Sequence, residues 1–392
     1  MKIPSNKQFF SGRELQYISE AIDSGDIGSD GQFTRECARL LEQRFLIPNV
    51  LMTPSCTSAL EIAAMLCELK SGDEVILPAF TFVSTANPII RLGARPVFVD
   101  IREDTLNIDE RLIEPVVTSR TKAIFPVHYG GIGCDMDRIM AVARKYNLIV
   151  VEDAAQGLGA FYKGRALGSI GHLGAFSFHH TKNQTCGEGG ALCINSPELL
   201  SRAEIIRDKG TNRSRYLRGE IDKYTWVDSG SSHVPSELSC AFLYAQLEML
   251  DLIRHRREEV FHFYDRHLHR FAAEGLLSLP FPPEDCDSNY HIYYVMLPDR
   301  TTRDALMAHL NRCGTGAASH YVPLHSSPMG QTFGYKAGDL PVTEEMSGRL
   351  LRLPAYPDLK EQEQLQVVKQ LSVFVGQSTV TSPRSEFELA RA

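Results

Sequence analysis

Residues 148–156 read LIVVEDAAQ, a short apolar run that ends in acidic and small residues. Ile149, Val150 and Val151 are apolar at consecutive positions, which is typical of a strand buried on both faces of a sheet. In open α/β sheets, ligands bind beyond the carboxyl ends of the strands. Asp153, directly after the strand predicted at Leu148–Glu152, is therefore a candidate functional residue.

Further short apolar runs lie on either side of this strand, and longer helical patterns alternate with them. The other predicted strands are Val50–Met52, Glu74–Leu77, Pro96–Asp100, Ala123–Val127 and Ala175–Phe178. The predicted helices between them are Ser58–Leu69, Ser84–Leu92, Asp109–Val116 and Met136–Tyr146. This alternation predicts an α/β fold, in which helices cover both faces of a parallel sheet.

The length of 392 residues suggests more than one domain. We expect a large domain over residues 1–240 and a smaller C-terminal α+β domain over residues 241–376. A helical segment from Ser236 towards Phe271 is expected to lead from one to the other. Residues 377–392, rich in Ser, Thr and charge, are expected to form a poorly ordered tail. The elements expected in the small domain are a strand at His291–Leu297, a helix at Thr302–Arg312 and a last helix after Lys360.

Composition limits the classes of partner. The net charge is −7 and no basic block occurs, which argues against bulk nucleic-acid binding. The nine cysteines are scattered without a C-x-x-C pair, so neither a disulfide framework nor a structural zinc site is expected. We find no signal-like N-terminus and no apolar window near the roughly 20 residues that cross a bilayer. We therefore expect a cytoplasmic protein without a membrane partner.

Three features match the needs of pyridoxal 5′-phosphate. Lys182 ends the run SFHHTK (177–182) and can form a Schiff base. Asp153 can pair with a pyridinium nitrogen. The TPSCTS run (53–58) leads into a helix whose free N–H groups suit a phosphate. Each feature also has a plain structural interpretation: an N-cap or loop residue for Asp153, a solvated side chain for Lys182, and a simple helix cap for TPSCTS. From the residues alone, both interpretations stand.

Longer motifs carry a family resemblance. PAFTFVSTAN (78–87), PVHYGG (126–131), VEDAAQ (151–156) and SFHHTKN (177–183) followed by GEGG (187–190) resemble the DegT/DnrJ/EryC1/StrS family of sugar aminotransferases. The similarity extends from GSDGQF (28–33) to HYVPLH (320–325). It implies the fold-type-I, aspartate-aminotransferase-like architecture, with a mostly parallel seven-stranded sheet in the large domain, and a homodimer with active sites at the subunit interface.

The resemblance also implies the reaction. L-Glutamate would donate its amino group through the pyridoxamine 5′-phosphate form of the cofactor to a nucleotide-linked keto sugar. The expected pair is dTDP-4-dehydro-6-deoxy-D-glucose and L-glutamate, giving dTDP-4-amino-4,6-dideoxy-D-galactose and 2-oxoglutarate. Alternatives within the family are a 3-keto sugar substrate, a sugar dehydratase and a non-enzymatic regulator. Family dehydratases carry His in place of the Schiff-base lysine, so Lys182 argues against that alternative.

The resemblance also implies a role for individual residues of this chain, at the positions that match the family's motifs. Lys182 would be the Schiff-base lysine and proton shuttle, and Asp153 the partner of the pyridinium nitrogen. The other expected cofactor contacts are Gln156 to the ring hydroxyl, Phe82 stacked on the ring, and Cys56, Thr57 and Ser177 on the phosphate. Many members place an asparagine on the phosphate of the neighbouring subunit's cofactor, where this chain offers Ser232.

Several histidines need separate treatment. His128, His320 and His325 are candidate substrate contacts, although His128 serves equally well as a polar residue that structures the turn after its strand. His255, His262, His267 and His269 crowd one helical region, but their spacing does not place three ring nitrogens on one face with an acidic partner. We therefore expect no metal site.

Overall fold

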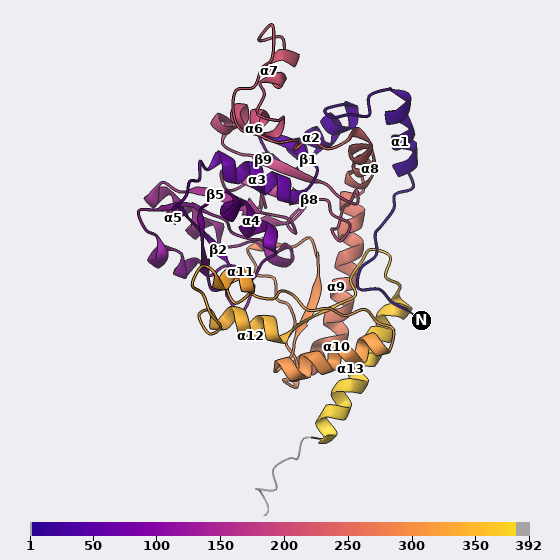
Figure 1. The fold of residues 1–392 in the computed structure, drawn as a ribbon. Coiled ribbons are helices and arrows are strands. Elements are labelled where there is room, and N and C mark those ends of the chain that lie inside the picture. The colour runs from indigo at the N-terminus through magenta and orange to yellow at the C-terminus, as the bar shows by residue number, and fades with distance from the viewer. Residues whose placement is uncertain (1, 382–392) are drawn as a thin grey trace, which may run out of the picture.

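The computed structural model describes residues 2–381, and its centre is a seven-stranded sheet (Figure 1). Only β9 runs antiparallel to its neighbours in the order β1-β9-β8-β5-β4-β2-β3. The predicted mostly parallel α/β sheet is confirmed. The strands are β1 Asn49–Thr53, β2 Glu74–Pro78, β3 Arg95–Val99, β4 Thr121–Ile124, β5 Ile149–Asp153, β8 Leu173–Ser177 and β9 Gly190–Ile194.

Helices cover both faces of this sheet because neighbouring strand residues point to opposite sides. Val150 packs in one apolar cluster with helices α2, α5 and α8, whereas the next residue, Val151, packs in a second cluster with α3, α4 and α6. The strands are therefore apolar on consecutive positions, as the sequence predicted for 149–151. These helices are α2 Gln32–Phe45, α3 Cys56–Leu66, α4 Val83–Arg91, α5 Met136–Tyr146, α6 Leu200–Arg207 and α8 Glu237–Leu247.

A smaller α+β body follows in the chain. Its antiparallel pair of strands, β11 (Tyr293–Met296) and β12 (Leu350–Leu353), packs with helices around a third apolar cluster, which Ile3 from the N-terminal segment joins. Figure 1 shows the long helix α9 leading from the large body to this part of the chain. The helices here are α9 Leu250–Ala273, α10 Arg300–Arg312, α11 Pro328–Gln331, α12 Pro341–Arg349 and α13 Glu361–Thr381.

The remaining elements are α1, which packs in the large apolar cluster through Tyr17 and Ala21, and several short helices and strands in connections. Helix α7 sits on an arm that projects from the large body in Figure 1, beyond α6. A small three-stranded sheet joins β10, β6 and β7. These elements are α1 Glu14–Asp23, α7 Arg213–Leu217, β6 Phe161–Tyr162, β7 Arg165–Ala166, β10 Cys286–Asp287 and the 3₁₀ turns η1 Glu110–Leu112, η2 Glu114–Val116, η3 Tyr129–Gly131 and η4 Pro197–Leu199.

The structure differs from the expected elements in three places. The predicted helix at Asp109–Val116 is two 3₁₀ turns, since Pro115 has no N–H to continue a helix. The segment after Ser236 divides into α8 and α9 near Met249. Helix α13 continues through Thr381, into the stretch expected to be a tail, and residues 382–392 lie outside the described residues.

The domain boundary at 240 remains a prediction. Helix α8 packs in the apolar cluster of the large sheet through Ala241 and Leu247, and the cluster of the small body begins along α9 at Val260. We therefore propose that the change from the large to the small domain falls within α9.

Candidate active site

A cavity of about 460 Å³ opens at the carboxyl ends of β5 and β8, between the large sheet and the small body. This volume is typical of small-molecule sites. Of the residues predicted from the sequence, the cavity is lined by Cys56, Thr57, Phe82, Asp153, Gln156, Ser177, Lys182 and His320.

The N-terminus of α3 forms one end of the cavity. Ser55 caps the helix by accepting the N–H of Ser58 at 3.1 Å. The N–H groups of Cys56 and Thr57 have no hydrogen-bond acceptor among the described residues. Gly190 of β9 passes so close that a Cβ there would lie 2.4 Å from the Cys56 nitrogen. Free N–H groups and the positive end of the helix dipole suit an anion such as a phosphate.

Asp153, the last residue of β5, is held in a fixed orientation. Its Oδ2 accepts the hydroxyl of Thr85 at 2.7 Å, and its Oδ1 accepts the N–H of Ala155 at 3.1 Å. The Thr85 hydroxyl also lies 2.8 Å from that of Thr81, so a buried hydroxyl pair supports the carboxylate. Sequence reasoning missed Thr85, although it lies within the PAFTFVSTAN motif.

Lys182 points into the same cavity. Burial lowers the pKa of Lys182 from its ordinary value. The acidic groups of Cys56 and Asp153 oppose this shift, and positively charged Arg352 adds to it. The net lowering increases the fraction of neutral amine at a given pH. A neutral amine is the form that attacks carbonyl groups and accepts protons.

The small body supplies the opposite wall. Tyr321 stacks on His320, with ring centroids 4.2 Å apart, and its hydroxyl accepts the amide of Gln156 at 3.0 Å. Gln156 also accepts the N–H of Gly130 at 2.7 Å, which fixes its amide orientation. His291 and Arg352 line this wall as well, and sequence reasoning singled out neither.

Phe82 and Ser232 occupy exposed positions. Phe82 lines the cavity yet is 58% exposed, so its ring has a free face. Ser232 is exposed and is not among the residues that line the cavity of its own chain. Its predicted contact with a neighbouring subunit's cofactor remains a prediction.

Two of the candidate histidines lie away from the cavity, and their predicted substrate contacts remain predictions. His128 is fully buried, its Nε2 lies 2.8 Å from Glu152 Oε2, and its Nδ1 accepts the N–H of Cys134 at 3.1 Å. His325 is also fully buried, and its Nε2 lies 2.8 Å from Glu344 Oε1. Neither histidine reaches the cavity, because each ring is used inside the protein to tie two segments together.

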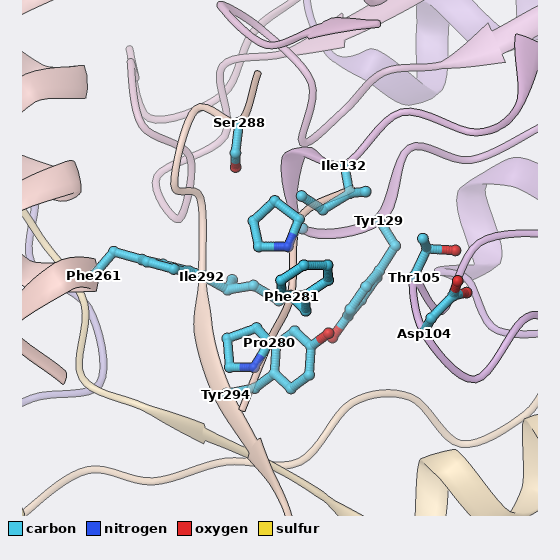
Figure 2. A pocket seen from close by; sticks show the side chains of 12 residues that line it. Asp104, Thr105, Tyr129, Ile132, Phe261, Pro280, Phe281, Ser288, Ile292 and Tyr294 are labelled. Carbon is cyan, nitrogen blue, oxygen red and sulfur yellow. The ribbon is translucent and has the colours of Figure 1, made fainter. Parts of the chain in front are cut away.

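Four smaller hollows within residues 2–381 are lined by none of the predicted site residues. Figure 2 shows Tyr129, Ile292 and Tyr294 around a second hollow of about 10 Å³, which is near the smallest size that holds one water. Within residues 2–381, no group of three or more His, Cys, Asp or Glu side chains is arranged to hold a metal ion. In the same range, every helix is too short or too polar to cross a bilayer.

Known proteins resemble this chain over most of its length. The model of the DegT/DnrJ/EryC1/StrS aminotransferase family matches residues 10–372. SpsC, a spore coat polysaccharide biosynthesis protein of Bacillus subtilis, is 36% identical over 372 residues, which cover 92% of this chain and 94% of SpsC.

Solved structures match over nearly the whole chain. Spr1654 of Streptococcus pneumoniae in its PMP form has a TM-score of 0.89 at 26% identity, covering 97% of this chain and 99% of that one. Its PLP form has a TM-score of 0.88 at 25% identity. The aminotransferase TlmJ of Streptoalloteichus hindustanus has a TM-score of 0.88 at 28% identity, covering 96% of this chain and all of TlmJ.

Proposed function

The chain belongs to the DegT/DnrJ/EryC1/StrS aminotransferase family, and we propose that it transfers the amino group of L-glutamate to dTDP-4-dehydro-6-deoxy-D-glucose, giving dTDP-4-amino-4,6-dideoxy-D-galactose and 2-oxoglutarate. Family membership confirms the predicted enzyme class, fold type and cofactor, pyridoxal 5′-phosphate. The comparisons support a sugar aminotransferase, and the particular sugar, its nucleotide and the donor are our proposal.

One observation carries the transaminase part of this proposal: a single cavity brings together an amine of lowered pKa, a fixed carboxylate and a helix N-terminus with free N–H groups. These are the three groups that pyridoxal phosphate requires. Their donor chemistry fits the cofactor, since the α3 N-terminus is built for an anion and Asp153 accepts a proton-bearing nitrogen.

When bound, pyridoxal phosphate supplies an electron-withdrawing ring that stabilises negative charge on the substrate carbon. Lys182 Nζ would attach the cofactor covalently and, once released, move the proton at the substrate carbon as general base and then acid. Asp153, oriented by Thr85 and the Ala155 N–H, would hold the ring nitrogen. Cys56, Thr57 and Ser177 would hold the phosphate.

Two further side chains would complete the cofactor site. The free face of Phe82 would pack on the ring, and the second amide hydrogen of Gln156 would reach the ring hydroxyl. The walls of the cavity, closed on one side by Tyr321, would limit the access of water to the reacting atoms.

We also propose a homodimer in which Ser232 of one subunit approaches the other subunit's site. Exposed apolar side chains on and beside the projecting arm around α7 support an interface: Leu217 is 59% and Trp226 76% exposed. A cytoplasmic location is supported by nine cysteines that form no disulfide.

The test of Lys182 uses the purified holoenzyme. Borohydride reduction and peptide mapping should place the cofactor adduct on Lys182, and Lys182→Ala should lose single-turnover transamination. Lys145→Ala, which removes an exposed lysine on α5, is the control and should keep the parent rate. An adduct on another lysine would refute the assignment.

The test of the substrate compares 4-keto and 3-keto dTDP-sugars with L-glutamate as donor, and the product is read by mass spectrometry and NMR. We expect an amino group at C4 of the sugar. Amination at C3 would assign the 3-keto alternative, and ammonia release without an amino product would assign the dehydratase alternative.

A further inference from the structure

His291 lines the cavity from a turn of the small body that comes just before β11. In this turn Tyr290 has a φ of 53°, a left-handed conformation that is uncommon for a residue with a side chain. The side chain of Asn289 donates to the carbonyls of Gln156 and Leu158, both at 2.8 Å. Its amide oxygen accepts the N–H of His291 at 3.1 Å. The turn is therefore tied to the loop that follows β5, and the position of His291 is fixed relative to the large body.

The amide of Asn183 decides which ring nitrogen of His291 carries the proton. Asn183 Nδ2 donates to the carbonyl of Asn289 at 3.0 Å, so Asn183 Oδ1 is the atom that lies 2.9 Å from Nδ1 of His291. The opposite amide orientation would set two acceptors against each other at Asn289. Because an amide oxygen can only accept, Nδ1 of His291 must donate, and in a neutral ring Nε2 is then unprotonated.

The surroundings of His291 keep its ring neutral. Burial lowers the pKa of His291 well below its ordinary value, and the cations Lys182, Arg257 and Arg352 add to this effect. His320, the remaining neighbour that titrates, acts in the same direction. Within residues 2–381, no carboxylate lies at ion-pairing distance from the ring. His291 therefore offers the cavity a neutral acceptor.

Nε2 of His291 and Nζ of Lys182 are complementary atoms that lack partners. No hydrogen bond involves either atom within residues 2–381, and both atoms remain accessible from the cavity that the two side chains line. Lys182 is also the first of the charged groups that act on His291. The ammonium form of a lysine can only donate, whereas an unprotonated ring nitrogen accepts.

We propose that His291 accepts a hydrogen bond from the ammonium group that Lys182 becomes when it takes the proton of the substrate carbon. This inference rests on the proposed role of Lys182 and adds a second catalytic residue beside it. The proton passes from carbon to Nζ, and His291 accepts only the hydrogen bond, so its ring is neutral before and after. Asn183 is a positioning residue, because it acts through the ring of His291.

The other groups near the amine are already committed. The carboxylate of Asp153 accepts two hydrogen bonds and would hold the ring nitrogen of the cofactor. Burial raises the pKa of the Cys56 thiol well above its ordinary value, so the thiol stays protonated. Nε2 of His320 accepts a hydrogen bond from Arg352. A neutral acceptor also stabilises an ammonium group less firmly than a carboxylate does, so the amine can give the proton up again.

The test measures the pKa of Lys182 in the apoenzyme, where the amine is free. The rate of covalent uptake of pyridoxal 5′-phosphate is followed by absorbance as a function of pH, and the midpoints of the variants are compared, so that the cofactor's own titration cancels. We expect His291→Phe to lower the midpoint by about 1–2 pH units, the range of a hydrogen bond to a charged group. His291→Gln, whose amide oxygen can replace Nε2, should restore most of the parent's midpoint.

His172→Phe is the matched control. His172 lies before β8, at the end of the sheet away from the cavity, and its Nδ1 accepts the N–H of Val150 at 2.9 Å. This variant also loses a ring hydrogen bond and should keep the parent's midpoint. Asn183→Leu leaves His291 in place but frees its tautomer, and it should lower the midpoint by a smaller amount. This second variant tests the proposal even if His291→Phe does not fold.

Three results would overturn the inference. An unshifted midpoint in His291→Phe or, where that variant does not fold, in Asn183→Leu would show that His291 does not contact the amine. A midpoint raised by His291→Phe would show that the ring is a cation. In the holoenzyme, His291→Phe should increase the isotope effect measured with α-deuterated L-glutamate, because removal of the proton becomes slower. An unchanged isotope effect would refute the catalytic role.

Lys182→Ala separates this inference from the proposed function. Covalent uptake that persists in Lys182→Ala would refute the attachment of the cofactor to Lys182, and the proposed mechanism would fail with it. If uptake is lost in Lys182→Ala while His291→Phe keeps the parent's midpoint, only the inference fails. A lowered midpoint in an enzyme that aminates no keto sugar would refute the proposed function and leave the contact between His291 and Lys182 standing.

Discussion

Replacing His128 with leucine would remove both hydrogen bonds of a ring that lies entirely inside the protein. The bond from Nε2 to the Glu152 carboxylate, 2.8 Å long, is worth about 1.5–3 kcal/mol as a hydrogen bond to a charged group. The N–H of Cys134 would lose its acceptor, and an unsatisfied buried donor costs about 1–3 kcal/mol. The sum is about 2.5–6 kcal/mol.

Such a loss is large beside the roughly 5–15 kcal/mol that stabilises folded proteins. Glu152 would keep the N–H groups of Gly168, Ile170 and Gly171, so its carboxylate would remain partly satisfied and the fold should survive. We therefore expect His128→Leu to fold, to unfold at a clearly lower urea concentration, and to keep the parent's KM for the keto sugar at temperatures where it is folded.

The assay is urea unfolding of the apoenzyme, followed by circular dichroism, together with steady-state kinetics. His255→Leu, at a histidine whose side chain is 65% exposed, is the matched control and should change stability by no more than about 0.5 kcal/mol. His128→Asn should recover part of the loss, because its amide oxygen can accept the Cys134 N–H. An unchanged urea midpoint with a raised KM for the sugar would show that His128 contacts substrate, and the reasoning would be refuted.

Three other perturbations test the cofactor site. Thr85→Val removes the hydroxyl bonded to Asp153 and should lower kcat by about tenfold or more, the equivalent of at least 1.5 kcal/mol. Thr85→Ser keeps a hydroxyl and should restore most of the rate. A full rate in the valine variant would show that Thr85 does not orient Asp153. Burial lowers the pKa of Lys182 from 10.5, so its neutral amine persists to lower pH. The rate at which apoenzyme takes up cofactor should therefore rise with pH through a midpoint below pH 10.5. A midpoint at or above that value would contradict the lowered pKa. Gly190→Ala places a Cβ 2.3 Å from the Ser55 carbonyl carbon and should weaken cofactor retention in equilibrium dialysis. The control is Gly348→Ala, whose Cβ would lie 3.6 Å from its nearest neighbouring atom and which should retain the cofactor as the parent does. Equal retention by the two variants would show that α3 tolerates a shift.

The sequence predicted the sheet well where strands are apolar on consecutive positions, as at 149–151. It missed β9, because GALCI follows a turn-rich GEGG run and an antiparallel strand interrupts the alternation of strand and helix. It also missed β12. Arg352 therefore could not be placed in the site, since only the pairing of β12 with β11 brings it towards Lys182.

The rule that ligands bind at strand ends located the site but did not say which side chains face it. Glu152 and Asp153 are consecutive on β5, and successive strand residues point to opposite sides. Asp153 meets Thr85 at the cavity, whereas Glu152 turns the other way and meets His128. After β4, Val127 lines the cavity and His128 does not. In each of the pairs 127–128 and 152–153, one residue faces the cavity and can bind a ligand, whereas its neighbour faces the core and braces it. A histidine after a strand is therefore a substrate candidate only when it points to the same side of the sheet as the carboxylate that faces the ligand.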